Sequence, residues 1–264
     1  MTVLYYIHDH DIKRRNVKVT ILERYNQAFE KIGNNEIEYS NYVISYIDLL
    51  GVKDVLQHDD GVSLNRMNLL YNRLLCYVDP ANKDFFKLDN VKIKIFSDNI
   101  IIAAEIKDDF TAAFKKVFRI TKILQGDALI QNGWLLRGGI SVGKLYIDDV
   151  FTMGKGIIAA YNLESQIANY PRVIIDKSII ASLNLDDFKM PYGIEEIYTD
   201  FDGEKYINYL SYFNKDSLRK ICEELHSYYL EMNHQESNLK VKQKYSWVIN
   251  YIEAVIGWCD RFNL

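Results

Sequence analysis

The chain has 264 residues, of which 48% are hydrophobic and only three are proline, so it is long enough to bury a sizeable core. Its formal net charge of -4 excludes wholesale attraction to nucleic acid or to an anionic membrane, and we expect neither as a partner. The three cysteines are odd in number and far apart, which is typical of buried thiols in a reducing cytoplasm.

Residues 1–40 are predicted to form an N-terminal extension, with a strand at Val3 to Ile7 and a helix from about Val19 to Ile32. A core domain over residues 41–213 follows. Its first strand runs from about Tyr42 to Asp48 and leads into a helix that begins at Val52. After a polar break, apolar residues recur at helical spacing as far as Val78, and Pro80 ends that helix.

The next elements are a hairpin and a long helix. The segments Val91 to Phe96 and Ile100 to Ala104 flank a tight turn at Ser97-Asp98-Asn99. Asp108 or Asp109 is expected to cap a helix that ends just before Gly126.

A glycine-bearing strand comes next, from Leu135 to Val142. The glycines of Arg137-Gly138-Gly139 predict close approach of another backbone or of a ligand. Gly143-Lys144 is expected to turn the chain so that Leu145 to Ile147 pairs back. A helix from Gly154 to about Asn169 and a short parallel-type strand from Arg172 to Asp176 complete this part.

The end of the chain is predicted to be helical. After a hairpin at about 194–209, residues 214–264 are expected to form a helical hairpin with helices at about 216–232 and 239–259. The order of elements predicts an α+β fold with one antiparallel sheet and helices packed on it.

Two strands of this plan end in a single carboxylate. Asp48 ends the strand that begins near Tyr42, and Asp98 lies at the hairpin tip. An ionised carboxylate at the edge of a core must be paired or must coordinate a cation, so the two together predict a metal site. The alternative is that Asp48 caps a helix and Asp98 is a turn residue.

Four segments resemble motifs of the class III nucleotidyl cyclases over roughly residues 40–176. They are, in order, Tyr46-Ile47-Asp48-Leu49-Leu50-Gly51, Lys94-Ile95-Phe96-Ser97-Asp98, Arg137-Gly138-Gly139-Ile140-Ser141-Val142-Gly143 and Gly154-Lys155-Gly156-Ile157-Ile158-Ala159-Ala160-Tyr161-Asn162-Leu163-Glu164. The chain departs from that family in three places. Ile158 stands where the family has its transition-state Asn, Asn162 where it has an Arg, and Phe151 where adenylate cyclases have a base-selecting Asp.

With these departures the chain is similar to the bacterial pyrimidine cyclases of the Pycsar anti-phage systems. That resemblance implies a homodimer with shared active sites that converts UTP or CTP to cUMP or cCMP, with cUMP weakly favoured. The product would activate a separately encoded effector. It also implies two Mn²⁺ or Mg²⁺ ions, bridged by Asp48 and Asp98 with the Leu49 carbonyl completing one shell. The phosphates would be held by the backbone N–H groups of Leu50, Gly51, Val52 and Lys53.

The resemblance gives other residues a role at the nucleotide. Lys94 is the lysine that would meet the base, and its alternative is a solvated strand lysine. Tyr46 would pack on the nucleotide or in the core. Arg137 would contact phosphate from the partner subunit or pair with an acidic loop. Asn162, one turn beyond Ile158, would contact the ribose.

Three other functions stay open. The first is a degenerate cyclase domain that binds a nucleotide without catalysis, which Ile158 and Asn162 favour. The second is an adenylate or guanylate cyclase, which Phe151 disfavours. The third, a diguanylate cyclase, lacks its Gly-Gly-Asp/Glu-Glu-Phe signature here.

Overall fold

The computed structural model describes residues 38–52, 61–77 and 90–262. The predicted strand at Val3 to Ile7 and the predicted helix over Val19 to Ile32 lie outside these ranges, as do Pro80 and all but the first residue of the helix expected from Val52. The chain divides into two compact units, Met1–Glu38 and Tyr39–Leu264, and all the elements given below belong to the second. The domain boundaries expected near residues 40 and 213 stay predictions.

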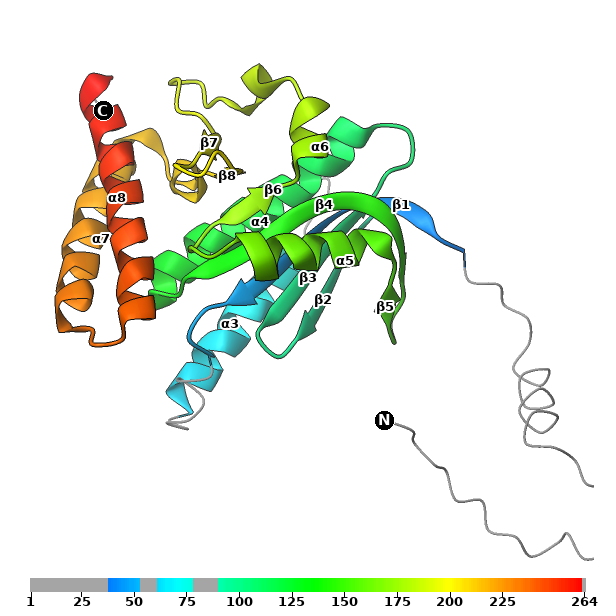
Figure 1. The fold of residues 1–264 in the computed structure, drawn as a ribbon, viewed down its shortest axis with the longest axis horizontal. Coiled ribbons are helices and arrows are strands. Elements are labelled where there is room, and N and C mark those ends of the chain that lie inside the picture. Colours follow the sequence, from blue (N-terminus) through cyan, green and yellow to red (C-terminus); the bar gives the residue numbers. More distant parts are fainter. Residues whose placement is uncertain (1–37, 53–60, 78–89, 263–264) are drawn as a thin grey trace, which may run out of the picture. The chain divides into compact units, whose positions relative to one another are not determined.

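The strands of this unit form a sheet in the order β2-β3-β1-β4-β6-β8-β7, with β5 beside β4 (Figure 1). They are β1 (Ser40–Leu49), β2 (Val91–Phe96), β3 (Asn99–Glu105), β4 (Leu136–Ile147), β5 (Thr152–Met153), β6 (Val173–Ile175), β7 (Ile197–Thr199) and β8 (Lys205–Ile207). All pairings are antiparallel except that of β4 with β6. The predicted α+β fold with a mainly antiparallel sheet is therefore confirmed, as is the short parallel strand.

Helices cover both faces of the sheet, with α5 on one face and α3 and α4 on the other (Figure 1). The helices are α3 (Val62–Cys76), α4 (Phe110–Asn132), α5 (Lys155–Asn162), α6 (Lys177–Ala181), α7 (Lys215–Gln235) and α8 (Leu239–Arg261). Shorter turns are η1 (Leu163–Ile167, a π-helix), η2 (Leu185–Phe188) and η3 (Tyr209–Tyr212). Within the described ranges, no helix is both long and apolar enough to cross a membrane.

Strand β1 lies in the middle of the first four strands and is buried on both faces. Val43 and Ile47 point into the large core that includes α4, whereas Tyr42 and Ile44 belong to a smaller cluster with Ala160 of α5. A strand covered on both faces needs apolar residues throughout rather than in alternation. This explains why large apolar side chains occupy both faces from Tyr42 to Ile47, with the small buried Ser45 as the one polar residue between them.

Strand β4 differs from the prediction at its second half. We expected a turn at Gly143-Lys144, but the strand continues without a break to Ile147. The glycine serves packing instead of a turn, because a Cβ on Gly143 would lie 2.9 Å from Gly156 Cα at the start of α5. A Cβ on Gly139 would likewise lie 2.6 Å from the carbonyl oxygen of Ala160. The predicted close approach of another backbone is thus confirmed.

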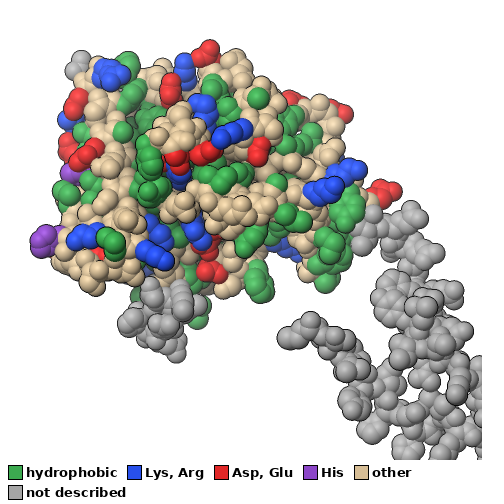
Figure 2. Space-filling view, in the orientation of Figure 1, with side chains coloured by type: hydrophobic (Ala, Val, Ile, Leu, Met, Phe, Trp, Pro, Cys, Tyr) green, Lys and Arg blue, Asp and Glu red, His purple; other side chains and the backbone are tan. Residues whose placement is uncertain are grey.

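The helix expected from Gly154 to Asn169 is shorter than predicted. Helix α5 ends at Asn162 and the chain continues as the π-helix η1. Large apolar side chains stay exposed on α5 and on the loop and strand before it, and Figure 2 shows hydrophobic side chains gathered over this region. We call this surface the β5–α5 face: Val150, Phe151, Met153, Ile158 and Tyr161.

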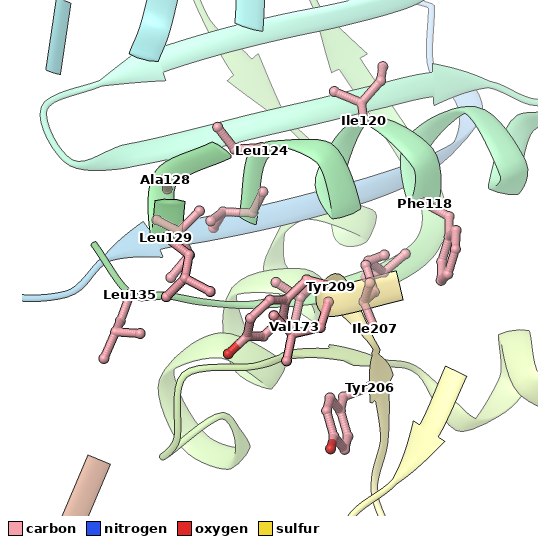
Figure 3. Close-up of a cluster of buried hydrophobic side chains, with 14 of the residues drawn as sticks. Phe118, Ile120, Leu124, Ala128, Leu129, Leu135, Val173, Tyr206, Ile207 and Tyr209 are labelled. Carbon is pink, nitrogen blue, oxygen red and sulfur yellow. The ribbon is translucent and has the colours of Figure 1, made fainter. Parts of the chain in front are cut away.

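Helix α4 supplies much of the main core, in which its Phe118 and Leu129 belong to one buried cluster with residues of β6 and β8 (Figure 3). Asp109 caps it by accepting a hydrogen bond from the Ala112 N–H, as one of the two predicted caps. The end predicted at Gly126 is wrong.

Helix α4 continues past Gly126, and the glycine does not end it but leaves room for a side chain that packs against the helix there. A Cβ there would lie 2.6 Å from the Tyr212 ring, so glycine is needed for packing. Gly133, with φ of 64°, is the residue that ends α4.

The predicted C-terminal helical hairpin is confirmed as α7 and α8, which pack on each other and on the main core. Cys222 and Cys259 are buried there as expected. Cys76, on α3, is exposed, so the expectation of a buried thiol is wrong for that residue. It lies on the outer face of α3, whose buried residues are Met67, Leu70 and Leu74.

Candidate functional site

The two predicted carboxylates come together where β1 ends. Asp48 pairs with Asn99 in the β1–β3 register, and Asn99 directly follows Asp98. The Leu49 N–H donates a hydrogen bond of 3.1 Å to the carbonyl oxygen of Asp98. The end of one strand and the tip of the neighbouring hairpin are therefore joined through the backbone.

The hairpin tip is held from outside the sheet. Ser97 has φ of 58°, a left-handed conformation that costs a non-glycine residue energy. The Tyr71 hydroxyl on α3 donates a hydrogen bond of 2.9 Å to the Ser97 carbonyl. Burial, together with the charge of Asp98, raises the pKa of Tyr71 to about 12, so this donor stays protonated. Helix α3 thus fixes the turn that carries Asp98.

Arg137 links Asp48 to a third carboxylate. Its Nε lies 3.1 Å from Asp48 Oδ2, and its terminal nitrogen lies 2.7 Å from Glu164 Oε1. Glu164 is on η1, where the π-helix follows α5, and only 3% of it is exposed. Of the two roles expected for Arg137, the pairing with acidic residues is present, although these residues lie on a strand and a helix and not on a loop. The phosphate contact stays a prediction.

Burial dominates the electrostatics of these acids. It raises the pKa of both Asp48 and Glu164, and Arg137 opposes the rise in each case. The charge of Asp98 raises both values further. Two partly buried carboxylates with raised pKa values, beside the carboxylate of Asp98 and around a single arginine, form a site with affinity for additional positive charge.

A second set of contacts connects Tyr46 to Asp98. The Tyr46 hydroxyl donates a hydrogen bond of 2.8 Å to Asn99 Oδ1, and Asn99 Nδ2 donates one of 3.2 Å to Asp98 Oδ1. The Tyr46 ring also packs edge-on against Tyr161 of α5, with 5.5 Å between the ring centroids. Tyr46 is half-buried and packs against the smaller core cluster, and its contact with a nucleotide stays a prediction.

The backbone N–H groups of Leu50, Gly51, Val52 and Lys53 were expected to hold the phosphates, and the first of them is already hydrogen-bonded within the protein. The Leu50 N–H donates a hydrogen bond of 2.9 Å to the carbonyl of Leu135, so in this structure it is paired with the residue just before β4 and not with a ligand. Gly51 has φ of 85° and ends the strand in a turn. Lys53 lies outside the described residues. Phosphate binding by the N–H groups of Gly51 and Val52 stays a prediction, as does metal binding by the Leu49 carbonyl.

The other expected nucleotide residues lie around the same face of the sheet. Lys94 pairs with Ile101, which pairs with Tyr46, so the three side chains share one face. In the loop after β4, the hydrogen bond from the Tyr146 hydroxyl, followed by one from the Phe151 N–H, lowers the pKa of Asp148, and the charge of Lys94 adds a smaller effect in the same direction. Asn162 is exposed at the end of α5 and accepts a hydrogen bond of 3.4 Å from Gln166.

Sequence reasoning missed Glu164, Asn99 and Tyr71 as members of the site. Asn99 and Glu164 stood within the quoted segments but had no role assigned to them. Tyr71 is separated from Ser97 by 26 residues and lies in a segment that the sequence predicts only as a helix. The register of β1 with β3 and β4, together with the packing of α3 and η1 against the sheet, shows which of these side chains meet.

The donor set suits a hard divalent ion such as Mg²⁺ or Mn²⁺, which proteins hold with one or two carboxylates while substrate phosphates and water complete the shell. Asp48 and Asp98 fit that pattern. Among the described residues, no group of three or more His, Cys, Asp or Glu side chains is placed to hold a metal by itself. A metal here would therefore depend on oxygen atoms from a bound substrate.

Comparison with solved structures finds nucleotidyl cyclase domains. No protein-family model matches the sequence, and comparison with curated proteins finds no match. The monomeric guanylyl cyclase domain of the RhoGC fusion protein from the aquatic fungus Blastocladiella emersonii is 11% identical. That match has a TM-score of 0.46 and covers 64% of this chain and 95% of the domain.

An adenylate/guanylate cyclase/hydrolase from Silicibacter pomeroyi is 18% identical, with a TM-score of 0.40, over 64% of this chain and 95% of that one. A bacterial light-regulated adenylyl cyclase is 9% identical, with a TM-score of 0.41, over 88% of this chain and 67% of that one. Similarity at this level does not transfer an activity from one protein to another.

Proposed function

We propose that this protein is a nucleotidyl cyclase that converts a nucleoside triphosphate to its 3′,5′-cyclic monophosphate and pyrophosphate. The observation that carries the proposal is the meeting of Asp48 and Asp98 at the joined ends of β1 and the β2–β3 hairpin. Asp48 is partly buried beside two other carboxylates, an arrangement that a domain without cation chemistry has no physical reason to keep.

The reaction requires the ribose 3′-oxygen to attack the α-phosphorus while the bond to the bridging oxygen of pyrophosphate breaks. Two divalent ions, when bound, would lower the pKa of the attacking hydroxyl and neutralise the leaving charge. The protein's part is to hold the reacting groups in place. Asp48 and Asp98 would bind the ions, and Tyr46 and Asn99 keep the Asp98 carboxylate oriented.

Arg137 is suited to exchange partners when a substrate binds. Its guanidinium contacts Asp48 on one side and the buried Glu164 on the other. A cation on Asp48 would repel it, while Glu164 would keep it within the site. Arg137 is then positioned to donate to a phosphate oxygen, for which its planar fork is well matched.

We further propose that the substrate is a pyrimidine, UTP or CTP, and that the cyclic product activates an effector in anti-phage defence. This rests on the resemblance of the four sequence motifs, with Phe151 in place of an acidic base-selecting residue. Lys94 shares the face of Tyr46 and would donate to a pyrimidine carbonyl. A single lysine donor serves uracil and cytosine alike, so the choice between them depends on other groups.

A homodimer is part of the proposal because the β5–α5 face is apolar and exposed. Val150 is 88% and Met153 56% exposed, unusual values for large apolar side chains that lie so close together along the chain. Asn162 lies at the end of the same helix, α5. A second copy packed on this face would bring its own Asn162 toward the site.

The second candidate is a domain that binds a nucleotide without cyclising it. It is favoured by Ile158, which is 59% exposed where the resembled family has a polar transition-state residue. A product assay separates the two candidates. We expect the purified chain, incubated with each of ATP, GTP, CTP and UTP and with Mn²⁺, to form a cyclic pyrimidine monophosphate detectable by mass spectrometry.

The same assay covers the purine alternatives, since cyclic AMP or cyclic GMP would identify an adenylate or guanylate cyclase. Consumption of no triphosphate, although one binds, would leave only the nucleotide-binding domain. Lys94→Ala is the informative variant for base choice, because it should weaken the preferred triphosphate more than the others.

A further inference from the structure

A pocket of about 430 Å³ lies beside the first half of the C-terminal helix α8. Two of its aromatic side chains come from elsewhere in the chain, since Tyr170 precedes β6 and Phe201 lies in the turn between β7 and β8. Helix α8 contributes a third ring and several polar side chains, among them Trp247, Lys242, Gln243 and Asn250. This volume, with several aromatic rings and a few polar groups, is typical of a site for a small molecule.

Two of the three rings are held in place by the protein itself. The Tyr170 ring is nearly parallel to that of Trp247, with 13° between the ring planes and 6.2 Å between the centroids. The Trp247 indole N–H donates a hydrogen bond of 2.8 Å to Asp200, and Asp200 forms an ion pair with the fully buried Arg172. The guanidinium carbon of Arg172 lies 5.6 Å from the centroid of the Tyr170 ring. A ligand would therefore meet rings that are already ordered, which lowers the cost of binding.

Phe201 supplies an exposed aromatic surface beside these rings. It contacts Tyr170 edge-on, with 5.5 Å between the ring centroids, yet 75% of the residue is exposed. Trp247 is only 6% exposed, so Phe201 is the ring with the most surface left to cover. Stacking on an aromatic side chain is favourable for every nucleobase, because each base has a π-face.

The polar side chains of the pocket have binding capacity that the protein does not use. Lys242 is half-buried, and in the described part of the chain it forms no ion pair within 4.0 Å. The side-chain amides of Gln243 and Asn250 have no hydrogen-bond partner among the described residues either. An ammonium group binds an anion, and an amide offers the donor and acceptor that the edge of a nucleobase also carries.

The charges around the pocket favour an anionic ligand. Lys242 is the one charged side chain among the described residues that line the pocket. Asp200 and Asp202, which flank Phe201 in the sequence, both form ion pairs with Arg172. Neither aspartate therefore competes with a ligand for the Lys242 ammonium group.

We propose that this pocket is a second ligand site, separate from the one at Asp48 and Asp98, and that it binds a nucleoside monophosphate. The base would stack on Phe201 with its edge toward the amides of α8, and the phosphate would pair with Lys242. The inference does not depend on the proposed cyclase activity.

Calorimetry with AMP, GMP, CMP and UMP in the presence of EDTA tests the inference, because EDTA removes the cations that the candidate site at Asp48 and Asp98 needs. We expect at least one of the four to bind. Phe201→Ala should weaken that binding about tenfold through the lost stacking, and Lys242→Ala should weaken it by a similar factor through the lost ion pair.

Lys240→Ala is the matched control, because Lys240 is exposed on the same helix and does not line the pocket. It should bind as wild type does. If none of the four nucleotides binds at millimolar concentration, or if either Phe201→Ala or Lys242→Ala binds as tightly as wild type, the inference is overturned.

The corresponding nucleoside, which lacks the phosphate, separates the two contacts. Its binding should still depend on Phe201 and should be the same in wild type and Lys242→Ala. A nucleoside that binds Lys242→Ala more weakly than wild type would show that the substitution acts through the fold, and would refute the assigned phosphate contact.

The variant Asp98→Asn separates this inference from the proposed function. Binding of the monophosphate should be the same in Asp98→Asn and in wild type. Binding that is lost in Asp98→Asn would assign the nucleotide to the candidate site and refute the second one. Binding that depends on Phe201 and Lys242 in a protein that forms no cyclic product would refute the cyclase and leave the second site standing.

Discussion

At the scale of single residues, the site is a small set of buried charges whose protonation is coupled to folding. Glu164 is the most enclosed of them, with Arg137 as its only ion-pair partner among the described residues. Burial raises its pKa above the usual value for a glutamate, despite the opposing arginine. The folded protein therefore binds the Glu164 proton more tightly than the unfolded chain does. The stability that this proton contributes is present at low pH and is lost as pH rises through the raised pKa.

We predict that Glu164→Gln stabilises the protein at pH 8 relative to wild type, because glutamine keeps the shape and removes the buried charge. The difference in Tm should shrink as pH falls and vanish below about 4.5, where wild-type Glu164 is protonated in both states. Thermal unfolding of the two proteins over a pH series measures it. A lower Tm for Glu164→Gln at pH 8 would mean that the ion pair with Arg137 outweighs the cost of burial.

Some of the site residues could be predicted from the sequence and others could not. Asp48 and Asp98 were visible because each ends an apolar strand, and polar residues at such places need a reason. Glu164 and Tyr71 reach the site because η1 and α3 pack against the sheet, next to residues that lie far from them in the sequence. Such contacts leave no local pattern in the sequence.

At the scale of elements, glycines decide how closely α5 approaches the sheet. Gly143 on β4 and Gly156 on α5 face each other, and a Cβ on either would lie within about 3.1 Å of the other residue's backbone. Helix α5 leads directly into η1 with Glu164, so its distance from β4 also sets the position of that carboxylate. The site depends on a backbone contact well away from it in the sequence.

We predict that Gly143→Ala destabilises the protein by roughly 1–3 kcal/mol, because backbone atoms cannot move aside as a flexible side chain would. Gly257→Ala is the matched control: Gly257 lies inside α8, and a Cβ there would meet nothing within 4 Å. That change should stabilise by about 0.5–1 kcal/mol through helix propensity. Chemical denaturation measures both, and an unchanged midpoint for Gly143→Ala would contradict the tight packing.

Element types were predicted well from the sequence, and their ends were predicted poorly. Periodicity placed β1, the β2–β3 hairpin and the two C-terminal helices within a few residues of where they lie. The sequence predicts that Gly126 ends a helix and that Gly143 turns a strand, yet each lies inside its element. Gly126 makes room for the Tyr212 ring, and Gly143 makes room for α5. A glycine that ends an element and one that admits a partner look alike until the partner is known.

At the scale of the whole molecule, the proposed function requires a protein partner that covers the exposed apolar β5–α5 face. Isolated apolar side chains on a surface are ordinary, but Val150, Phe151, Met153 and Ile158 follow one another along a loop, a strand and a helix. We propose a second copy of the chain as the partner there, because the resembled cyclases share their active sites between two subunits.

We predict that Met153→Glu weakens self-association by at least tenfold, a typical effect of placing a charge in an apolar interface, and reduces cyclisation in parallel. Leu64→Glu is the control, since Leu64 is similarly exposed on α3, away from this face. Light scattering coupled to gel filtration gives the mass of each variant. A wild-type protein that is monomeric at concentrations where it is fully active would contradict the proposed dimer.

The most direct test of the central proposal is the rate of cyclic nucleotide formation by wild type, Asp48→Asn and Asp98→Asn at matched Mn²⁺ concentrations. We predict that wild type forms a cyclic pyrimidine monophosphate and that each asparagine variant, although folded, loses about a hundredfold or more of that rate. If the variants cyclise the nucleotide as fast as wild type, the two carboxylates do not hold the ions and the proposed two-metal site is wrong.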